Sequence, residues 1–393
     1  MPHTLHLTPY TLHLTLYAHE PNQPDQPMKE IPEFIDREAD IKRMKAVLSG
    51  RPNLLYFVYG PINSGKTALL MKVLEELPEE YRVFYINFRG IETRRYEDFI
   101  RAMFTVRYEG IWEKIKAKGE IFESVLRFGE NVLKKVNDKF IVPLEVVKAF
   151  LKGEDEKGDC FYYLEKLMDH LNSKGYRPVF ILDELQMLKE VKKNGPILHD
   201  LFNFLVRMTK ETHLCHSLCS TSDCLFIEDI YSNARLEGRA KYILVDDLPK
   251  DEAYELYEGF GFNDKELVWD WIGGKVGDMV RLYEEKKQGY SEEEGLRNML
   301  KDEVGRLEDL LEKIGAGRRI FNFEGGEFLI DISKVEDVLR IFKTNEEVSK
   351  KGIDLVYRNY LIYENILFYN PLEGTIRPQG RLILRAIREL CDK

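Results

Sequence analysis

The sequence contains few cysteines and no long uninterrupted run of apolar residues. Only 5 of its 393 residues are cysteines, too few for a disulfide-stapled scaffold, which favours a reducing cytoplasm. No apolar stretch reaches the roughly 18 residues that a membrane-spanning helix needs. Hydrophobic residues still make up 44 % of the chain, as in globular proteins. We therefore expect a cytoplasmic protein with no membrane partner.

The chain also lacks an excess of positive charge. It has 58 Lys and Arg residues against 68 Asp and Glu residues, which gives a net charge of −10. An acidic chain is not drawn as a whole to nucleic acid, so DNA binding would need a local basic face. The length allows two or three domains.

Residues 1–27 contain no Lys or Arg but hold four of the 8 histidines, namely His3, His6, His13 and His19. The absence of a basic start argues against a signal peptide. The alternation of Leu, Thr and His is compatible with a strand, and metal binding by the histidines is an open alternative. We expect a flexible leader, with the folded protein beginning near Met28.

Five short apolar runs, with helical periodicity between them, organise the first 250 residues. The first run is followed by a glycine loop, an amphipathic helix and the second run, which is a βαβ unit. This pattern predicts an α/β fold with a parallel sheet covered by helices. The predicted strands are Leu54–Tyr59, Arg82–Phe88, Pro178–Leu182, His213–Cys219 and Lys241–Val245.

The segment Gly60–Thr67 reads GPINSGKT and fits the pattern G-x-x-x-x-G-K-[ST]. Its glycines let successive backbone amides turn inward toward phosphate oxygens, and the following helix adds its positive dipole end. Lys66 would neutralise the β and γ phosphates, and the Thr67 hydroxyl would hold Mg²⁺. The predicted nucleotide contacts here are Gly60, Pro61, Ile62, Asn63, Ser64, Gly65, Lys66, Thr67 and Ala68.

Two carboxylates, Asp183 and Glu184, follow the third apolar run. Ligands of doubly wound sheets bind at the carboxyl ends of the strands, where these acids would emerge. We expect Asp183 to bind Mg²⁺ and Glu184 to act as the general base on the attacking water. The alternative for the pair is a solvated helix cap.

Two further elements are less specific. A polar residue of Ser220–Ser222 could sit between the two motif strands and touch the γ-phosphate or the attacking water, or the cluster could cap a helix. Arg239, which lies just before the fifth strand, could stabilise the charge of phosphoryl transfer, or form a surface salt bridge. Arg235 lies nearby.

Taken together, these motifs make the chain resemble the archaeal ATPase family, within the AAA+/STAND group of P-loop NTPases. The resemblance rests on the two motifs already described and on the segments Phe34–Glu38, Gly238–Ala240 and Trp271–Gly274. It covers roughly residues 30–290 well and the C-terminus more loosely.

The resemblance implies ATP as the nucleotide, a five-stranded core, a helical lid and a C-terminal winged helix. It also implies that Phe34, Ile35 and Arg37 lie near the adenine and that Arg239 faces the phosphates. The expected boundaries are 28–248 for the core, with a helical insertion at about 91–160, then 249–291 for the lid and 292–393 for the winged-helix-like domain. Where the family often has a proline after two glycines, this chain has Val276-Gly277.

Two other clusters of side chains suggest ligand sites. Cys215, His216, Cys219 and Cys224 suggest zinc, but on a strand His216 would point away from the first two cysteines, so buried thiols are favoured. A hairpin is predicted near the end of the chain, with strands Leu361–Tyr369 and Thr375–Arg377 joined by the turn Asn370–Gly374. Arg381, Arg385 and Arg388 share a helical face after this hairpin, which could be a wing. That face could bind DNA phosphates, or be a solvated helix paired with neighbouring acids.

Three functions are therefore open: an Mg²⁺-dependent ATP-hydrolysing enzyme, a nucleotide-controlled switch that grips a protein or DNA partner, and a DNA-binding regulator with little turnover.

Overall fold

The computed structural model describes residues 37–90, 98–99, 103, 160–189, 191, 197–231, 236–323 and 325–392. The predicted leader 1–27, most of the predicted insertion at about 91–160, and Phe34 and Ile35 lie outside these ranges. Among the helices within them, none combines the length and the apolar character needed to cross a membrane.

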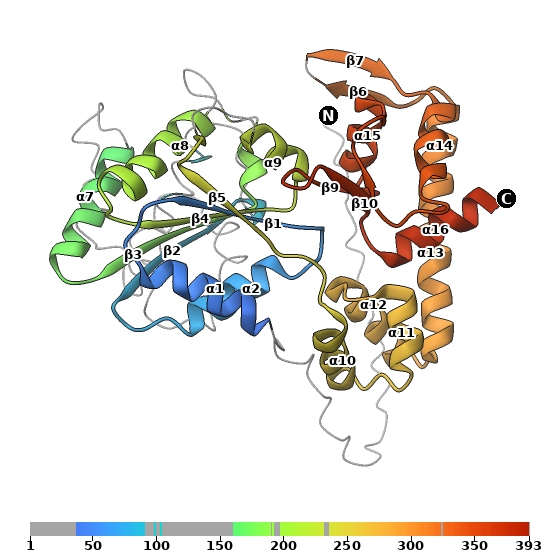
Figure 1. Ribbon diagram of the computed structural model, residues 1–393, viewed down its shortest axis with the longest axis horizontal. Coiled ribbons are helices and arrows are strands. Elements are labelled where there is room, and N and C mark those ends of the chain that lie inside the picture. The colour runs from blue at the N-terminus through green and yellow to red at the C-terminus, as the bar shows by residue number, and fades with distance from the viewer. Residues whose placement is uncertain are drawn as a thin grey trace, which may run out of the picture.

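A five-stranded sheet forms the centre of the first part of the chain (Figure 1). Every pairing within it is parallel, so the carboxyl ends of its strands meet at one edge. This confirms the predicted α/β class. In spatial order the strands are β2 (Tyr81–Asn87), β3 (Arg177–Asp183), β4 (His216–Thr221), β1 (Leu55–Tyr59) and β5 (Ala240–Leu244).

Helices cover both faces of the sheet (Figure 1). Helices α1 (Glu38–Ser49) and α2 (Lys66–Glu75) lie on one face, and α7 (Cys160–Ser173) and α8 (Ile197–Val206) lie on the other. Because side chains alternate along a strand, Phe57 packs in the core that includes Phe204 of α8, whereas Val58 packs in the core that includes Leu70 of α2. Burial on both faces explains why these strands read as continuous apolar runs.

Three short helices follow the sheet and pack around a hydrophobic cluster that contains Tyr257, to which Leu296 of the next helix and Leu382 of the last helix also contribute. They are α10 (Lys250–Gly259), α11 (Lys265–Ile272) and α12 (Val276–Lys287), and we call them the helical group. The long helix α13 (Glu292–Gly315) then begins with a capping box between Ser291 and Glu294. It packs against α12 and the last helix of the chain.

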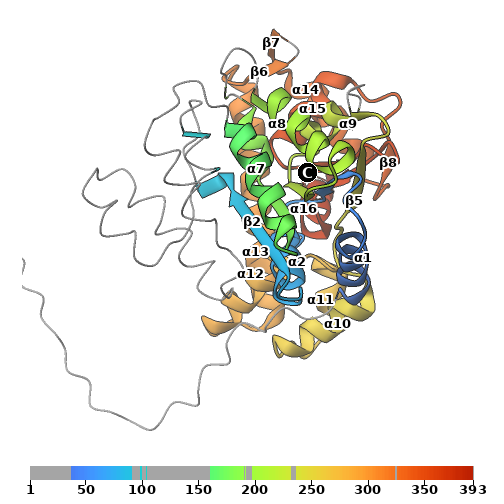
Figure 2. The ribbon, with the colours of Figure 1, turned by 90° about the vertical axis from the view of Figure 1, so that its left-hand side faces the viewer.

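The remaining elements form what we call the C-terminal module, residues 320–392. A hairpin, β6 and β7, lies at one end of the molecule and the helical group at the other in both views (Figures 1 and 2). The module comprises β6 (Ile320–Phe323), β7 (Gly326–Leu329), α14 (Ile332–Ile341), β8 (Val348–Ser349), α15 (Leu355–Tyr363), β9 (Leu367–Asn370), β10 (Thr375–Pro378) and α16 (Arg381–Asp392).

The predicted strands of the sheet differ from the observed ones by one to three residues, and two predicted strands begin at least three residues too early. The run 361–369 was predicted to be a single strand, but α15 continues to Tyr363 and β9 begins only at Leu367. The side chain of Asp354 accepts a hydrogen bond from the Val356 amide at 2.9 Å and so starts a helix through this apolar stretch. Strand β4 begins at His216 rather than at His213, which has a left-handed φ of 56°.

Candidate functional site

The segment Gly60–Thr67 connects the carboxyl end of β1 to the start of α2. Two of its residues have left-handed backbones, Asn63 with φ 59° and Gly65 with φ 90°. A Cβ at Gly60 would lie 2.0 Å from the carbonyl oxygen of Val245, so no larger residue fits there. These constraints give the loop the turned conformation that lets successive amides converge on an anion.

The ammonium group of Lys66 is folded back onto its own loop. Its Nζ donates to the carbonyl oxygens of Pro61 at 2.8 Å and Gly60 at 3.2 Å. Burial lowers the pKa of Lys66 to about 8, although the neighbouring carboxylate of Glu184 opposes that shift. The ammonium group can exchange these carbonyl partners for an incoming phosphate, since a charged phosphate oxygen is a better acceptor than a carbonyl oxygen.

The second predicted motif lies against the first at the same edge of the sheet. The Thr67 hydroxyl donates to Asp183 Oδ2 at 2.9 Å, and Asp183 is almost fully buried. A third residue, Tyr85 of β2, donates its phenol to the same oxygen at 2.8 Å. Burial and the nearby Asp183 raise the pKa of Tyr85 well above its usual value. Sequence reasoning missed Tyr85, because only the strand order brings β2 beside β3.

Glu184 is held by a cation and an amide. Its backbone is left-handed, with φ 58°, and one carboxylate oxygen accepts from Arg89 at 2.8 Å. The other accepts from the side-chain Nε2 of Gln186 at 2.6 Å, and the side-chain Oε1 of Gln186 accepts from the Thr221 hydroxyl at 2.6 Å. Because β4 lies between β1 and β3, Thr221 reaches the acid pair from the middle of the sheet.

In the polar cluster after β4, Thr221 is connected to Glu184 through Gln186, and its hydroxyl also accepts from the Asp223 amide at 3.1 Å. The start of α9 (Cys224–Tyr231) is capped by Asp223, whose carboxylate accepts from the Phe226 amide at 2.9 Å. Contact of this cluster with phosphate or with the attacking water stays a prediction. Ser220 is buried, and its hydroxyl has no hydrogen-bond partner among the described residues. Neither Arg89 nor Gln186 had a signal in the sequence.

Arg37 braces the loop from the start of α1. Its guanidinium donates to the carbonyl oxygens of Ser64 at 2.6 Å and Asp246 at 2.7 Å. It also forms an ion pair with Asp40 at 3.1 Å. Arg37 therefore lies at the phosphate loop with its donors directed at backbone oxygens, and its position near the adenine stays a prediction.

Arg239 does not face the phosphate loop of its own chain, so the expectation that it faces the phosphates is wrong for a single copy. Arg239 precedes β5, and its carbonyl oxygen accepts from the amide of Leu55, the first residue of β1. Strands β1 and β5 are parallel, so Arg239 lies at the amino end of the sheet while the loop lies at the carboxyl end. The separation is roughly 15 Å, at about 3.3 Å per residue of strand.

The helical group and the C-terminal module both reach the loop. Lys275, just before α12, donates to the Ile62 carbonyl oxygen at 3.0 Å and pairs with Asp247 at 3.2 Å. The Ile62 amide in turn donates to Gln379 Oε1 at 3.1 Å. Close by, the phenol of Tyr59 donates to Asn370 at 2.8 Å. The peptide groups on both sides of Ile62 are thus bonded to residues more than 200 positions away.

A model of an ATPase domain found predominantly in Archaea matches residues 34–282, more than half of the chain. The chain belongs to this family. A second model, for the C-terminal domain of a group of uncharacterized ATP-binding proteins, matches residues 293–391. The predicted resemblance is confirmed.

Relatives of the family match along nearly their whole length. An uncharacterized ATP-binding protein of Methanocaldococcus jannaschii is 39% identical over 374 residues, covering 92% of this chain and 99% of the relative. One from Pyrococcus abyssi is 35% identical over 360 residues, covering 91% and 98%. The solved Walker-type ATPase of Pyrococcus abyssi has the same fold, with a TM-score of 0.57 and 16% identity over 93% of this chain and 99% of that one.

The three arginines predicted as a DNA-binding face are used for contacts inside this ATPase-family chain. Arg381 donates to the Trp269 carbonyl oxygen at 3.2 Å and lies over its ring. Arg385 pairs with Asp270, and Arg388 donates to the Phe342 carbonyl oxygen at 3.4 Å. These contacts join α16 to α11 and to the end of α14, while Arg381 itself stays exposed. DNA binding through these arginines stays a prediction.

The cysteines near β4 are buried in the core. Cys215, Cys219 and Cys224 are free thiols, fully or almost fully buried. Burial raises the pKa of all three thiols, which disfavours the thiolate that zinc requires. Among the residues that the structure describes, no group of three or more His, Cys, Asp or Glu side chains could hold a metal ion.

Proposed function

We propose that this protein binds ATP with Mg²⁺ at Gly60–Thr67, hydrolyses it slowly, and uses the state of the nucleotide to control contacts between the sheet, the helical group and the C-terminal module. The observation that carries the proposal is the hydrogen bond of 2.9 Å between Thr67 and Asp183. It joins the two motifs of a P-loop NTPase at one edge of the sheet. The names of the relatives as ATP-binding proteins support the choice of nucleotide.

The phosphates would lie against the loop amides at the start of α2. Lys66 would leave the carbonyl oxygens of Gly60 and Pro61 for the β and γ phosphates. The Thr67 hydroxyl and the Asp183 carboxylate are hard oxygen donors that fit Mg²⁺, and they would hold it beside the phosphates. When bound, that ion would neutralise charge on the phosphate oxygens.

Glu184 would accept the proton of the attacking water. Its carboxylate is buried beside Asp183 and Lys66, and Gln186 and Thr221 orient it. In the arrangement described here Arg89 occupies one of its oxygens. Turnover would therefore require Glu184 to exchange that partner for water, and such a step is consistent with a slow enzyme.

The switch rests on the contacts around Ile62. Lys275 is bonded to the Ile62 carbonyl oxygen and Gln379 to the Ile62 amide. A loop that closes on phosphates therefore has to rearrange its contacts with both residues. The Arg377 side chain also pairs with Asp246 at the same junction. Nucleotide binding would favour one arrangement of these parts by its differential affinity for it. The winged-helix description of the C-terminal module remains part of this proposal.

Two substitutions test the proposal. Lys66→Ala should weaken binding of labelled ATP about 10- to 100-fold, because a hydrogen bond to a charged group contributes about 1.5–3 kcal/mol. Glu184→Gln should retain ATP binding and lower steady-state phosphate release about 10²- to 10⁴-fold. Undiminished binding by the first variant would overturn the site, and unaltered phosphate release by the second would overturn the catalytic assignment.

A further inference from the structure

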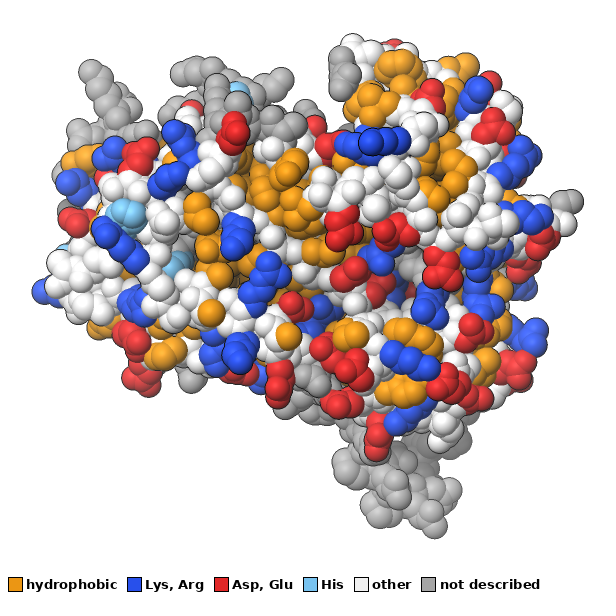
Figure 3. All heavy atoms as spheres, viewed as in Figure 1, with side chains coloured by type: hydrophobic (Ala, Val, Ile, Leu, Met, Phe, Trp, Pro, Cys, Tyr) orange, Lys and Arg blue, Asp and Glu red, His pale blue; other side chains and the backbone are white. Residues whose placement is uncertain are grey.

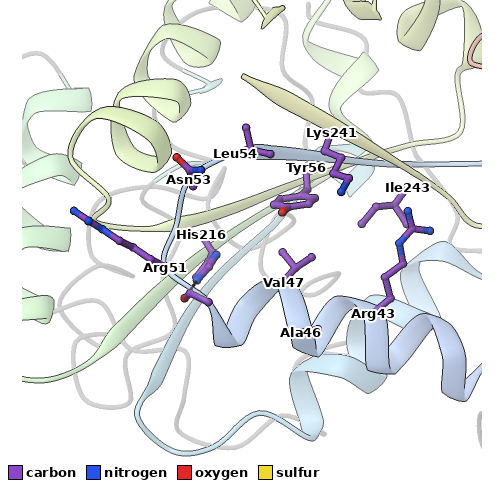
Figure 4. A pocket seen from close by; sticks show the side chains of 11 residues that line it. Arg43, Ala46, Val47, Arg51, Asn53, Leu54, Tyr56, His216, Lys241 and Ile243 are labelled. Atoms are coloured by element: carbon purple, nitrogen blue, oxygen red, sulfur yellow. Dashed lines mark hydrogen bonds between the residues drawn. The ribbon is translucent and has the colours of Figure 1, made fainter. Parts of the chain in front are cut away.

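A pocket lies between α1 and the amino ends of β1, β4 and β5 (Figure 4). Its volume is about 470 Å³, within the size range of small-molecule sites. Tyr56 and Lys241 line it from neighbouring strands, where they are register partners, and Arg43 lines it from α1. The phosphate loop follows the opposite, carboxyl end of β1, so the two regions are distinct.

The charge of this pocket has one sign. Arg43, Arg51 and Lys241 line it, and no Asp or Glu does. Among the described residues none of these three cations forms an ion pair or a side-chain hydrogen bond, whereas Lys45 on the same helix pairs with Glu76 at 2.9 Å. In a chain with a net charge of −10, an acid-free group of unpaired cations is a local exception that favours an anion.

The side chains are arranged around an aromatic ring. Figure 4 shows Tyr56 and Lys241 next to each other, with Arg43 reaching up from α1 at one end and Arg51 at the other end with its guanidinium directed outward. Over this part of the surface, Figure 3 shows blue and orange side chains with few red ones. A ligand here would meet two inward-facing cations and a partly exposed phenol ring.

His216 closes the inner end of the pocket without adding charge. It is buried, and its Nε2 lies 3.2 Å from the carbonyl oxygen of Gly50. Burial lowers the pKa of His216 to about 4, so the imidazole is neutral at pH 7. The positive charge of the pocket therefore comes from the arginines and the lysine, whose side chains are exposed and can reach a ligand.

We propose that this pocket binds a small phosphorylated molecule of mononucleotide size, with its phosphate between Arg43 and Lys241 and its ring against Tyr56. A phosphate group supplies the negative charge that these cations lack as a partner, and a flat ring can stack on the face of a tyrosine. The cations border a pocket rather than a long stripe, which favours a compact ligand over a nucleic-acid duplex. The proposal is independent of ATP hydrolysis at the phosphate loop.

The test uses the full chain carrying Lys66→Ala, so that the phosphate loop does not compete. Titration calorimetry with AMP should give one saturable site, and affinity should fall as salt rises. Arg43→Gln combined with Lys241→Gln should weaken AMP binding at least about tenfold. Tyr56→Leu should weaken binding of AMP while leaving the weaker binding of inorganic phosphate unchanged.

Lys45→Gln is the matched control, since it removes an α1 cation that is paired outside the pocket and should leave AMP binding unchanged. Circular dichroism should show that each variant is folded, because the substituted cations are exposed. The absence of saturable AMP binding, or equal affinity in the Arg43/Lys241 double variant, would overturn the proposal. Binding of a DNA or RNA oligonucleotide without binding of AMP would overturn the assignment to a small molecule.

Discussion

Two buried ionic side chains, Lys66 and Glu184, face each other across the candidate site. Each is bonded to a partner that nucleotide would have to replace: loop carbonyls for Lys66 and Arg89 for Glu184. A buried charge must keep a partner, because its desolvation is costly. Under the proposed function, the partners that stabilise these two charges in the free protein are therefore the ones that nucleotide and water would have to replace.

The affinity for ATP should depend on pH through Lys66. Its pKa in the free protein is lowered to about 8, so the ammonium is present below that pH and is lost above it. Phosphate favours the charged form, so affinity should be constant near pH 7 and fall progressively above about pH 8. Fluorescent-ATP titration across this range measures the effect.

Lys66→Arg provides the control for that titration, because a guanidinium stays protonated throughout. Its affinity, whatever its absolute value, should be flat over the same pH range. A flat profile for the unmodified protein would contradict the role of the Lys66 ammonium.

Arg89→Ala should increase ATP turnover by releasing Glu184. The side chain of Arg89 is 58% exposed, so solvent screens the pair and the increase should be modest, about two- to fivefold. Steady-state phosphate release measures it, with Glu184→Gln as the inactive reference. A decrease would instead mean that Arg89 assists the reaction.

At the scale of elements, the phosphate loop is held between β1, β5 and α1. The Ser64 hydroxyl donates to the Val245 carbonyl oxygen at 2.9 Å, and Arg37 donates to the Ser64 and Asp246 carbonyl oxygens. These bonds link the loop to the end of β5 so closely that Gly60 has no room for a side chain. The loop is therefore positioned before any ligand binds.

Gly60→Ala should abolish tight ATP binding and lower the melting temperature. The added Cβ would lie 2.0 Å from the Val245 carbonyl oxygen, which is backbone and cannot rotate away, so the loop and β5 must separate. Gly305→Ala is the matched control, since a Cβ there meets nothing within 4 Å. It lies within α13, and alanine should stabilise that helix by about 0.5–1 kcal/mol. Normal ATP binding by Gly60→Ala would contradict this account of the loop.

At the scale of the whole molecule, a single glutamine connects the C-terminal module to the phosphate loop. Gln379 is buried; it accepts from the Ile62 amide and donates to the Leu367 carbonyl oxygen of β9 at 3.1 Å. Arg381 and Arg385 hold the same α16 against α11. The loop is thus joined by hydrogen bonds to β9 of the module, and α16 of the module is joined to the helical group.

Gln379→Leu should loosen this connection while preserving side-chain volume. We expect faster hydrogen exchange around Ile62 in the nucleotide-free protein, because its amide loses its acceptor. ATP affinity should rise several-fold when the competing contact is gone. Arg340→Ala, an exposed change on α14, is the control. Unchanged exchange and affinity in Gln379→Leu would show that the contact does not oppose nucleotide binding.

Much of the fold could be predicted from the sequence, because each buried strand of a parallel sheet is a continuous apolar run. The strand 361–369 was wrong because an apolar run does not distinguish a buried helix from a strand, and the Asp354 cap decided it. Of the candidate site, the loop and the acid pair could be predicted. Tyr85, Arg89, Gln186, Lys275 and Gln379 could not, since their contacts depend on strand order and packing.

The sequence by itself determined the phosphate loop, because its glycines and the helix that follows are neighbours in the chain and set the local backbone directly. Only the tertiary structure decided which distant side chains meet it. Arg239 seemed suited to the phosphates but lies at the other end of a parallel strand, and the arginines of α16 form contacts with α11 and the end of α14 that their spacing did not predict. Parallel strand pairing and helix packing decide which way a side chain points, and neither follows from the residues next to it in the sequence.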